Sequence, residues 1–201
     1  MRIHIGCSGW SYPSWQPGFY PAGLARSAFL GYYAERFSTV ELNSLAYRLP
    51  AAEQFMRWRE GVPDGFSFAP KLVVRSAADA RRGIPRIALL GDALGPIRVV
   101  VTEPFDEATY DAVRETASDL PLAFDIRHES WSSVTGIVRV GDPLATPFTY
   151  LRMRDPPYSE SELHALVTSL GTPSYVYFRH EIEPTAPAYA ERAKELLAAR
   201  S

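Results

Sequence analysis

The sequence predicts a compact (β/α)8 barrel, in which eight parallel strands close into a ring and helices follow most of them. Short apolar, β-rich runs alternate with segments of helical periodicity along all 201 residues. This alternation favours strand–helix–strand units and a parallel sheet. Eight strand candidates can be distinguished and the chain ends on a helix, as such a barrel requires. An open, doubly wound sheet is the alternative that the same alternation allows.

Composition indicates one globular domain over residues 1–201. Hydrophobic residues make up 46% of the chain and charged residues 22%, and the formal net charge is −2. A chain so close to neutrality has no bulk attraction for nucleic acid or an anionic membrane. Cys7 is the single cysteine, which excludes an intramolecular disulfide framework. With no signal-peptide core and no apolar run near the ~20 residues of a membrane span, we expect a cytoplasmic protein without a membrane partner.

The strand candidates are short apolar runs bounded by turn or helix signals. The clearest is Ile-Arg-Val-Val-Val-Thr, because β-branched residues dominate it. In chain order, the eight candidates cover residues 3–7, 38–42, 66–70, 97–102, 121–126, 137–140, 148–153 and 175–178.

The helix candidates carry apolar residues at spacings of three and four, which form one stripe along a helix. Asp106 is placed to cap one helix, and Ser159 with Glu162 forms a capping box that opens another, which ends at Gly171. In chain order, helices are expected over residues 27–37, 50–60, 106–117, 160–170 and 185–199.

Three crossovers look too short or too weakly patterned for a full helix. They follow Lys71, Arg127 and Gly141, after the third, fifth and sixth strands. We therefore expect abbreviated or missing helices there, with apolar barrel wall left exposed over strands five to seven. Large exposed apolar patches mark interfaces, so the sequence predicts a homodimer through that side.

Several familiar chemistries are excluded by their motifs. The segment from Gly6 to Gly9 fits neither the dinucleotide nor the P-loop glycine pattern, and it lacks the spacing of a nucleophile elbow. His128-Glu129 and His180-Glu181 each lack the second histidine of a zinc-protease motif. Four histidines and one cysteine are too few for a structural zinc site.

Two carboxylates near predicted strand ends are the candidate acid and base. Glu41 and Asp125 lie on strands two and five, and across a barrel mouth they could face one another. The alternative is that each forms a structural ion pair with an arginine, Arg48 or Arg127. His128 is the third candidate catalytic residue, or it bonds only the backbone.

Other polar and aromatic residues near the strand ends are candidate ligand contacts. The basic ones would donate to phosphate or carboxylate, unless they neutralise the two carboxylates inside the barrel. The aromatic ones could stack on a sugar or base, or pack loops onto the barrel. The predicted substrate-binding residues are Trp10, Tyr12, Asn43, Tyr47, Arg48, Lys71, Arg127, Trp131, Tyr150 and Arg152.

No metal site is predicted. Glu41 and Asp125, with Asp142 or His128, could supply metal ligands, but their spacing in the sequence matches no metal-binding pattern. Cys7 is read as a small buried apolar residue. No cofactor can be identified from the sequence.

Several short segments carry a recognisable family pattern: Ile5-Gly6, Ser8-Gly9-Trp10-Ser11-Tyr12, Phe19-Tyr20-Pro21, Tyr33-Ala34, Thr39-Val40-Glu41-Leu42-Asn43-Ser44, Tyr47-Arg48-Leu49-Pro50, Trp58, Phe66, Phe68-Ala69 with Lys71, Arg127-His128 with Ser130-Trp131, and Tyr150 with Arg152. On these segments the chain resembles the YecE-like proteins, a family of unknown function regarded as TIM-type barrels. The resemblance implies the barrel fold, but it implies no reaction because the family has no established one. Asp125 stands where that family has Glu, Thr102 where it has Gln, Arg154-Asp155 where it has His-Gly, and His180-Glu181 where it has Asn-Asp.

Two functional hypotheses follow. The first is an enzyme that uses Glu41 with Asp125 or His128 for acid–base chemistry on a small polar, anionic substrate. Hydrolysis, isomerisation and lyase reactions all use these residue types, so the reaction class stays open. The second is a non-catalytic module that binds an anionic metabolite or a partner's acidic segment. Nucleic acid is not expected, because no basic stripe accompanies the aromatic residues.

Overall fold

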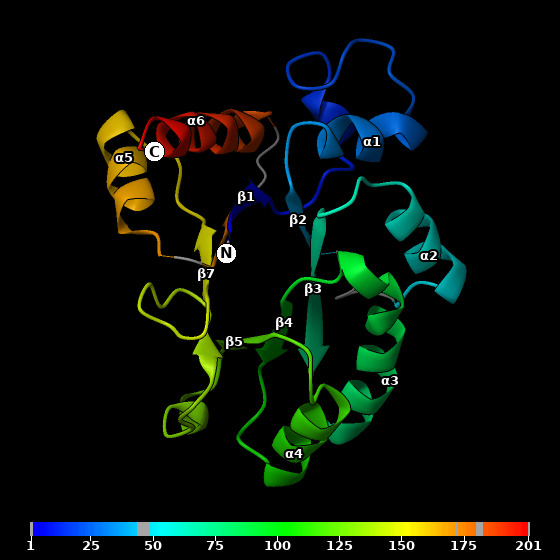
Figure 1. Cartoon of the computed structure of the whole chain (residues 1–201). Coiled ribbons are helices and arrows are strands. Elements are labelled where there is room, and N and C mark those ends of the chain that lie inside the picture. Colours follow the sequence, from blue (N-terminus) through cyan, green and yellow to red (C-terminus); the bar gives the residue numbers. More distant parts are fainter. Residues whose placement is uncertain (1, 44–48, 172, 180–182, 201) are drawn as a thin grey trace. The chain divides into compact units, whose positions relative to one another are not determined.

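A computed structural model describes residues 2–43, 49–171, 173–179 and 183–200. The chain forms two compact units, Met1–Glu41 with Gly141–Ser201, and Leu42–Val140. Strands and helices alternate along each unit (Figure 1). That residues 1–201 form a single domain stays a prediction beside this division into two units.

The first unit is built on parallel strands in the order β2-β1-β8-β7. They are β1 (Ile3–Cys7), β2 (Thr39–Leu42), β7 (Thr149–Met153) and β8 (Ser174–Phe178), and β8 pairs in register with both β1 and β7. Its helices are α1 (Phe29–Ala34), α5 (Glu160–Ser169) and α6 (Thr185–Ala199). Helix α6 packs on β1, β8 and α5 (Figure 1). The predicted capping box of Ser159 and Glu162 is confirmed at the start of α5.

Tyr33 links the first two strands through hydrogen bonds of its hydroxyl group. Its hydroxyl accepts a hydrogen bond from Cys7 N at 2.7 Å and donates one to Thr39 O at 2.9 Å. A Cβ on Gly6 would lie 2.1 Å from Thr39 O, so only glycine allows β1 and β2 to approach this closely. This contact sets the positions of the residues that follow β1 and end β2.

The second unit carries parallel strands in the order β6-β5-β4-β3. They are β3 (Ser67–Val74), β4 (Ile97–Val101), β5 (Leu122–Ile126) and β6 (Val138–Arg139). The helices are α2 (Ala52–Glu60), α3 (Ala77–Ile87) and α4 (Glu107–Thr116), with α3 and α4 side by side (Figure 1). Asp106 caps α4 as predicted, accepting from Thr109 N at 2.8 Å. Short 3-10 helices cover Pro13–Trp15 and Arg26–Ala28 in the first unit, and Ala88–Ala93 and Glu129–Trp131 in the second.

The crossover after β3 differs from the prediction. An eleven-residue helix, α3, stands where an abbreviated or missing one was expected, and β3 itself runs to Val74. The apolar positions Ala80, Ile84 and Ile87 form a buried stripe. Gly83 and Pro85 weaken the helical pattern in the sequence, and packing on the sheet overrides their low propensity. The prediction is confirmed after β5, where residues 127–137 hold a three-residue 3-10 helix, and after β6, where residues 140–148 contain no helix.

The prediction that apolar residues of strands five to seven are exposed is wrong. Leu122, Val138 and Leu151, on β5, β6 and β7, are buried. Among the described residues, Leu144 in the loop after β6 is the most exposed large apolar side chain, at 86%. The homodimer stays a prediction without this support.

No helix within the described ranges has both the length and the apolar character needed to cross a membrane.

Candidate functional site

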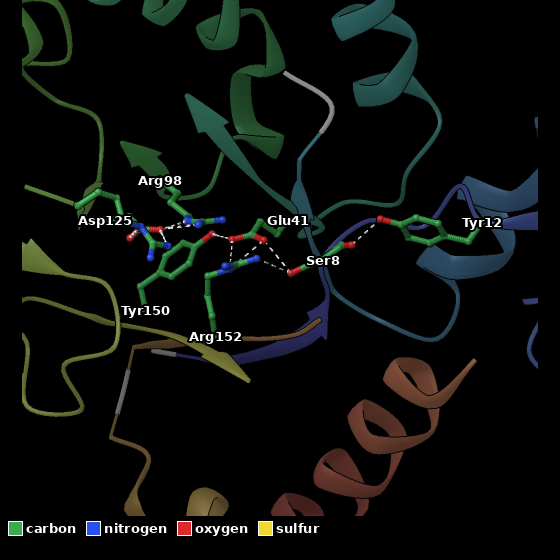
Figure 2. A network of polar contacts seen from close by, with 8 residues as sticks. Ser8, Tyr12, Glu41, Arg98, Asp125, Tyr150 and Arg152 are labelled. Carbon is green, nitrogen blue, oxygen red and sulfur yellow. Dashed lines mark hydrogen bonds and ion pairs between the residues drawn. The ribbon is translucent and has the colours of Figure 1, made fainter. Parts of the chain in front are cut away.

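Glu41 is a fully buried carboxylate near the carboxyl end of β2, with an exposed fraction of 0%. Ser8 Oγ donates a hydrogen bond to its Oε2 at 2.7 Å, and the Tyr150 hydroxyl donates to its Oε1 at 2.8 Å. Arg152 Nε lies 2.9 Å from Oε1 and 3.1 Å from Oε2. Figure 2 shows Tyr150 and Arg152 pointing toward Glu41. We call these four side chains the Glu41 cluster.

Strand periodicity assembles this cluster. Tyr150 and Arg152 are two residues apart on β7, so their side chains leave the same face of the sheet. Ser8 follows β1 directly, and the Tyr12 hydroxyl donates to the Ser8 carbonyl at 2.9 Å. Ser8 and Glu41 thus lie at the carboxyl-terminal part of β1 and β2, and Tyr150 and Arg152 reach them from the second and fourth residues of β7. In barrels of this class, that end of the strands is where catalytic groups lie.

A second hydroxyl pair joins β2 to β8. Thr39, two residues before Glu41, has its Oγ1 2.8 Å from the Tyr177 hydroxyl on β8. Burial raises the pKa of Tyr177 well above its ordinary value, so this phenol stays protonated. The Tyr150 and Tyr177 rings lie 5.1 Å apart. Tyr177 therefore supports the cluster as a neutral, buried neighbour.

Asp125 forms a separate ion-pair cluster in the second unit. Arg98 Nε donates to its Oδ2 at 2.9 Å, and Arg127 Nε lies 2.7 Å from its Oδ1. Burial pushes the pKa of Asp125 upward, but the two guanidinium groups outweigh it and hold the pKa below its ordinary value. The carboxylate is thus ionised and paired with Arg127, which is the structural alternative foreseen for this residue. That Glu41 and Asp125 face each other stays a prediction, since they belong to different units.

His128 occupies a capping position. It precedes the 3-10 helix Glu129–Trp131, and Ser130 N donates to its Nδ1 at 3.3 Å. The Ser130 hydroxyl is 2.8 Å from the same nitrogen. Because a backbone N–H can only donate, Nδ1 is an acceptor and Nε2 carries the proton of the neutral ring. The histidine therefore organises the end of β5, and its catalytic role stays a prediction.

The aromatic candidates divide between packing and the site. Trp131 is buried, donates through Nε1 to Glu103 O at 3.0 Å, and contacts Phe105 edge to face, so it packs the loop onto the unit. Tyr150 belongs to the Glu41 cluster. Trp10 and Tyr12 are partly exposed in the segment after β1, where stacking on a ligand stays a prediction.

The remaining candidates are placed less centrally. Lys71 lies in the middle of β3 rather than at its end, because the strand continues to Val74. Asn43 is half-buried directly after β2. Tyr47 and Arg48 lie outside the described residues.

Ser8 and Arg98 are the polar residues that sequence reasoning missed. Arg98 carried a signal, because a single arginine inside the run Ile97–Val101 must be neutralised where it is buried. Ser8 stood among the residues at the first strand end but offered no spacing motif. Its importance follows from the hydrogen bond to Glu41, which joins residues 33 positions apart.

Neither metal binding nor thiol chemistry finds a built site in the described ranges. No group of three or more His, Cys, Asp or Glu residues there could hold a metal ion. Cys7 is buried, and burial raises its pKa, which disfavours the reactive thiolate.

Comparison with solved structures identifies the fold. A DUF72 family protein from Thermotoga maritima MSB8 matches with a TM-score of 0.79 and 23% identity, covering 98% of this chain and 100% of that one. A DUF72 family protein from Enterococcus faecalis V583 matches with a TM-score of 0.77 and 17% identity, covering 98% and 96%. With the parallel strands and intervening helices described above, these likenesses confirm the TIM-type (β/α)8 fold.

Sequence comparison identifies the family. The UPF0759 protein YecE of Escherichia coli K12 is 39% identical over 69 residues, which are 34% of this chain and 23% of that protein. The match therefore spans about a quarter of the curated relative. The model of the family described as "Protein of unknown function DUF72" matches residues 4–140. This chain belongs to the DUF72 family.

Proposed function

We propose that this protein is an enzyme that uses Glu41 for acid–base chemistry on a small polar, anionic molecule. The observation that carries the proposal is the Glu41 cluster, in which a buried carboxylate near the carboxyl end of β2 accepts from the hydroxyls of Ser8 and Tyr150. A buried ion pair costs desolvation energy that a purely apolar core avoids. Its place at the functional end of the strands favours a chemical role over a structural one.

Each member of the cluster has a distinct task in this proposal. Glu41 accepts the proton of a hydroxyl that donates to it, from Ser8 at 2.7 Å or Tyr150 at 2.8 Å, while that hydroxyl takes a proton from the substrate; the reverse transfer returns the proton. Arg152 balances the negative charge and fixes the carboxylate orientation through Nε. Proton transfer of this kind serves hydrolysis, isomerisation and elimination alike.

The test compares turnover by wild type and Glu41→Gln. Both proteins are incubated with a mixture of small polar metabolites, and conversion is followed by mass spectrometry. General acid–base catalysis contributes ~10²–10⁴-fold, so conversion should fall by that factor while ligand-induced thermal stabilisation remains. Glu115→Gln, the same change at an exposed position of α4, is the matched control and should convert like wild type.

A second variant protects the test against misfolding. Tyr150→Phe removes one donor to Glu41 and keeps the ring and the charge pair. It should fold and convert more slowly than wild type. Wild-type conversion rates in both Glu41→Gln and Tyr150→Phe would remove Glu41 from the chemistry.

The second candidate is a binding module, and one observation favours it. Each oxygen of Glu41 already has two donors within 3.1 Å, so the carboxylate is well saturated without a substrate. In that case the wild type would convert nothing in the metabolite mixture and would still be stabilised by an anionic ligand. The same incubation, read by melting temperature, therefore separates the two candidates.

A further inference from the structure

The second unit holds two guanidinium groups on one buried carboxylate. Arg98, in β4, donates to Asp125 Oδ2 through both Nε and Nη2. Arg127, directly after β5, contacts the same carboxylate, with Nε 2.7 Å from Oδ1 and Nη2 3.0 Å from Oδ2. Figure 2 shows Arg98 and Asp125 pointing toward one another. We call these three residues the Asp125 cluster.

In the Asp125 cluster, two guanidinium groups contact a single carboxylate. Both arginines are charged at all ordinary pH values, and Asp125 supplies one negative charge because its pKa is held low. Lys71 is paired in register with Arg98, so β3 adds another cationic side chain to the same face of the sheet. A structural ion pair would be complete with Arg98 alone.

The two arginines differ in their access to solvent. The Arg98 side chain is 3% exposed, whereas the Arg127 side chain is 41% exposed. A guanidinium has five N–H donors, and Arg127 directs Nε and one Nη toward Asp125. The carboxylate therefore holds the Arg127 fork in one orientation, and its other N–H groups are available beyond the cluster. Such preorganisation lowers the entropic cost of binding.

We propose that Arg127 is the recognition residue for an oxyanion, the phosphate or carboxylate group of a small molecule. The fork of a guanidinium matches both groups through paired N–H···O bonds. The site lies immediately after β5, at the strand end where ligands bind in this class of fold. Arg98 holds Asp125 from the buried side, and the partly exposed Arg127 presents its remaining N–H groups to the ligand. The proposal goes beyond the proposed function, because anion binding at Arg127 requires no turnover and does not depend on Glu41.

The experiment titrates the ¹⁵N-labelled protein with inorganic phosphate and, separately, with acetate, at constant ionic strength set by chloride. NMR follows the Arg side-chain Nε–H signals. Saturable shifts of the Arg127 signal with either oxyanion are expected. Saturation by phosphate alone identifies a phosphate group as the ligand chemistry, and saturation by acetate identifies a carboxylate.

Two variants establish that Arg127 itself binds. Arg127→Gln removes the charge, and Arg127→Lys keeps the charge but loses the fork. Hydrogen bonds to charged groups are strong enough that affinity should fall by at least about tenfold in Arg127→Gln and by less in Arg127→Lys. Because Arg98 still pairs with Asp125, both variants keep a neutralised carboxylate and should fold. Arg82→Gln, which removes an arginine paired with Asp79 on α3, is the matched control and should bind like wild type.

Two outcomes would overturn the proposal. One is that neither oxyanion produces a saturable shift in the wild type, and the other is that Arg127→Gln binds as tightly as wild type. Neither result bears on Glu41, which belongs to the other unit. Conversely, saturable binding with no loss of turnover in Glu41→Gln would leave the anion site standing and remove the proposed acid–base role.

Discussion

At the scale of single residues, the energetics of the protein concentrate in buried charges. Glu41 and Arg152 are matched in charge and nearly excluded from water, with exposed side-chain fractions of 0% and 11%. The free energy of such a pair depends on both members, because each alone would be an unpaired charge in a medium of low dielectric constant. The hydroxyls of Ser8 and Tyr150 add donors that a lone ion pair would lack.

Removing one member of this pair should destabilise the fold strongly. Arg152→Met leaves the Glu41 carboxylate buried without its cation, and the free energy of unfolding should fall by about 3–5 kcal/mol. The double variant Glu41→Met with Arg152→Met removes both charges, so it should recover part of that loss. Urea denaturation of the two single variants and the double variant measures the coupling. Strictly additive losses would contradict a buried ion pair.

At the scale of secondary structure elements, close backbone approach and packing decide more than propensity. Helix α3 forms although Gly83 and Pro85 lie within it. Gly83 packs against β3, where an added Cβ would lie 2.6 Å from Leu72 Cδ1. A side chain at this position therefore requires Leu72 to shift.

Gly83→Ala should therefore lower stability even though alanine is the better helix former. The propensity gain is about 1 kcal/mol, and an overpacked contact costs about 1–3 kcal/mol. Adding Leu72→Ala gives the new methyl group room, so Gly83→Ala should become neutral or stabilising in that background. Thermal unfolding of the four proteins tests this. A melting temperature of Gly83→Ala above wild type would show that β3 and α3 move apart easily.

At the scale of the whole molecule, pH acts through the charged clusters. Burial raises the pKa of Asp125, but the guanidinium groups of Arg98 and Arg127 hold it below the ordinary value of 3.8. The unfolded chain therefore binds this proton at a higher pH than the folded chain does. The Asp125 contribution to stability is complete above about pH 3.8 and is lost as the pH falls through the folded-state pKa.

Asp125→Asn should accordingly flatten the acid limb of the stability profile. Asparagine cannot titrate, so the free energy of unfolding should fall less steeply below pH 4 than in wild type. Urea denaturation at pH 3 to 5 makes the comparison, with Asp111→Asn on the exposed side of α4 as control. The assignment fails if the slopes of Asp125→Asn and wild type coincide.

The sequence by itself determined the order of the elements and most of their bounds. Helix α6 covers the predicted residues 185–199, and the caps at Asp106 and Ser159 form as expected. These features arise from local chemistry, namely apolar periodicity and side chains that bond to neighbouring N–H groups. The alternation of strands and helices likewise predicted the fold class, because it restricts the sheet to parallel pairing.

Beyond the foreseen pair of Asp125 with Arg127, tertiary structure decided which charges meet. Arg152 pairs with Glu41 from 111 residues away, and Arg98 with Asp125 from 27 residues away. The sequence offered several arginines for each carboxylate, and only strand order and register select among them. Helix α3 was decided in the same way, since burial of Ala80, Ile84 and Ile87 outweighs a weak local pattern. The physical reason is common to these cases: burial makes a long-range contact worth more than local preference.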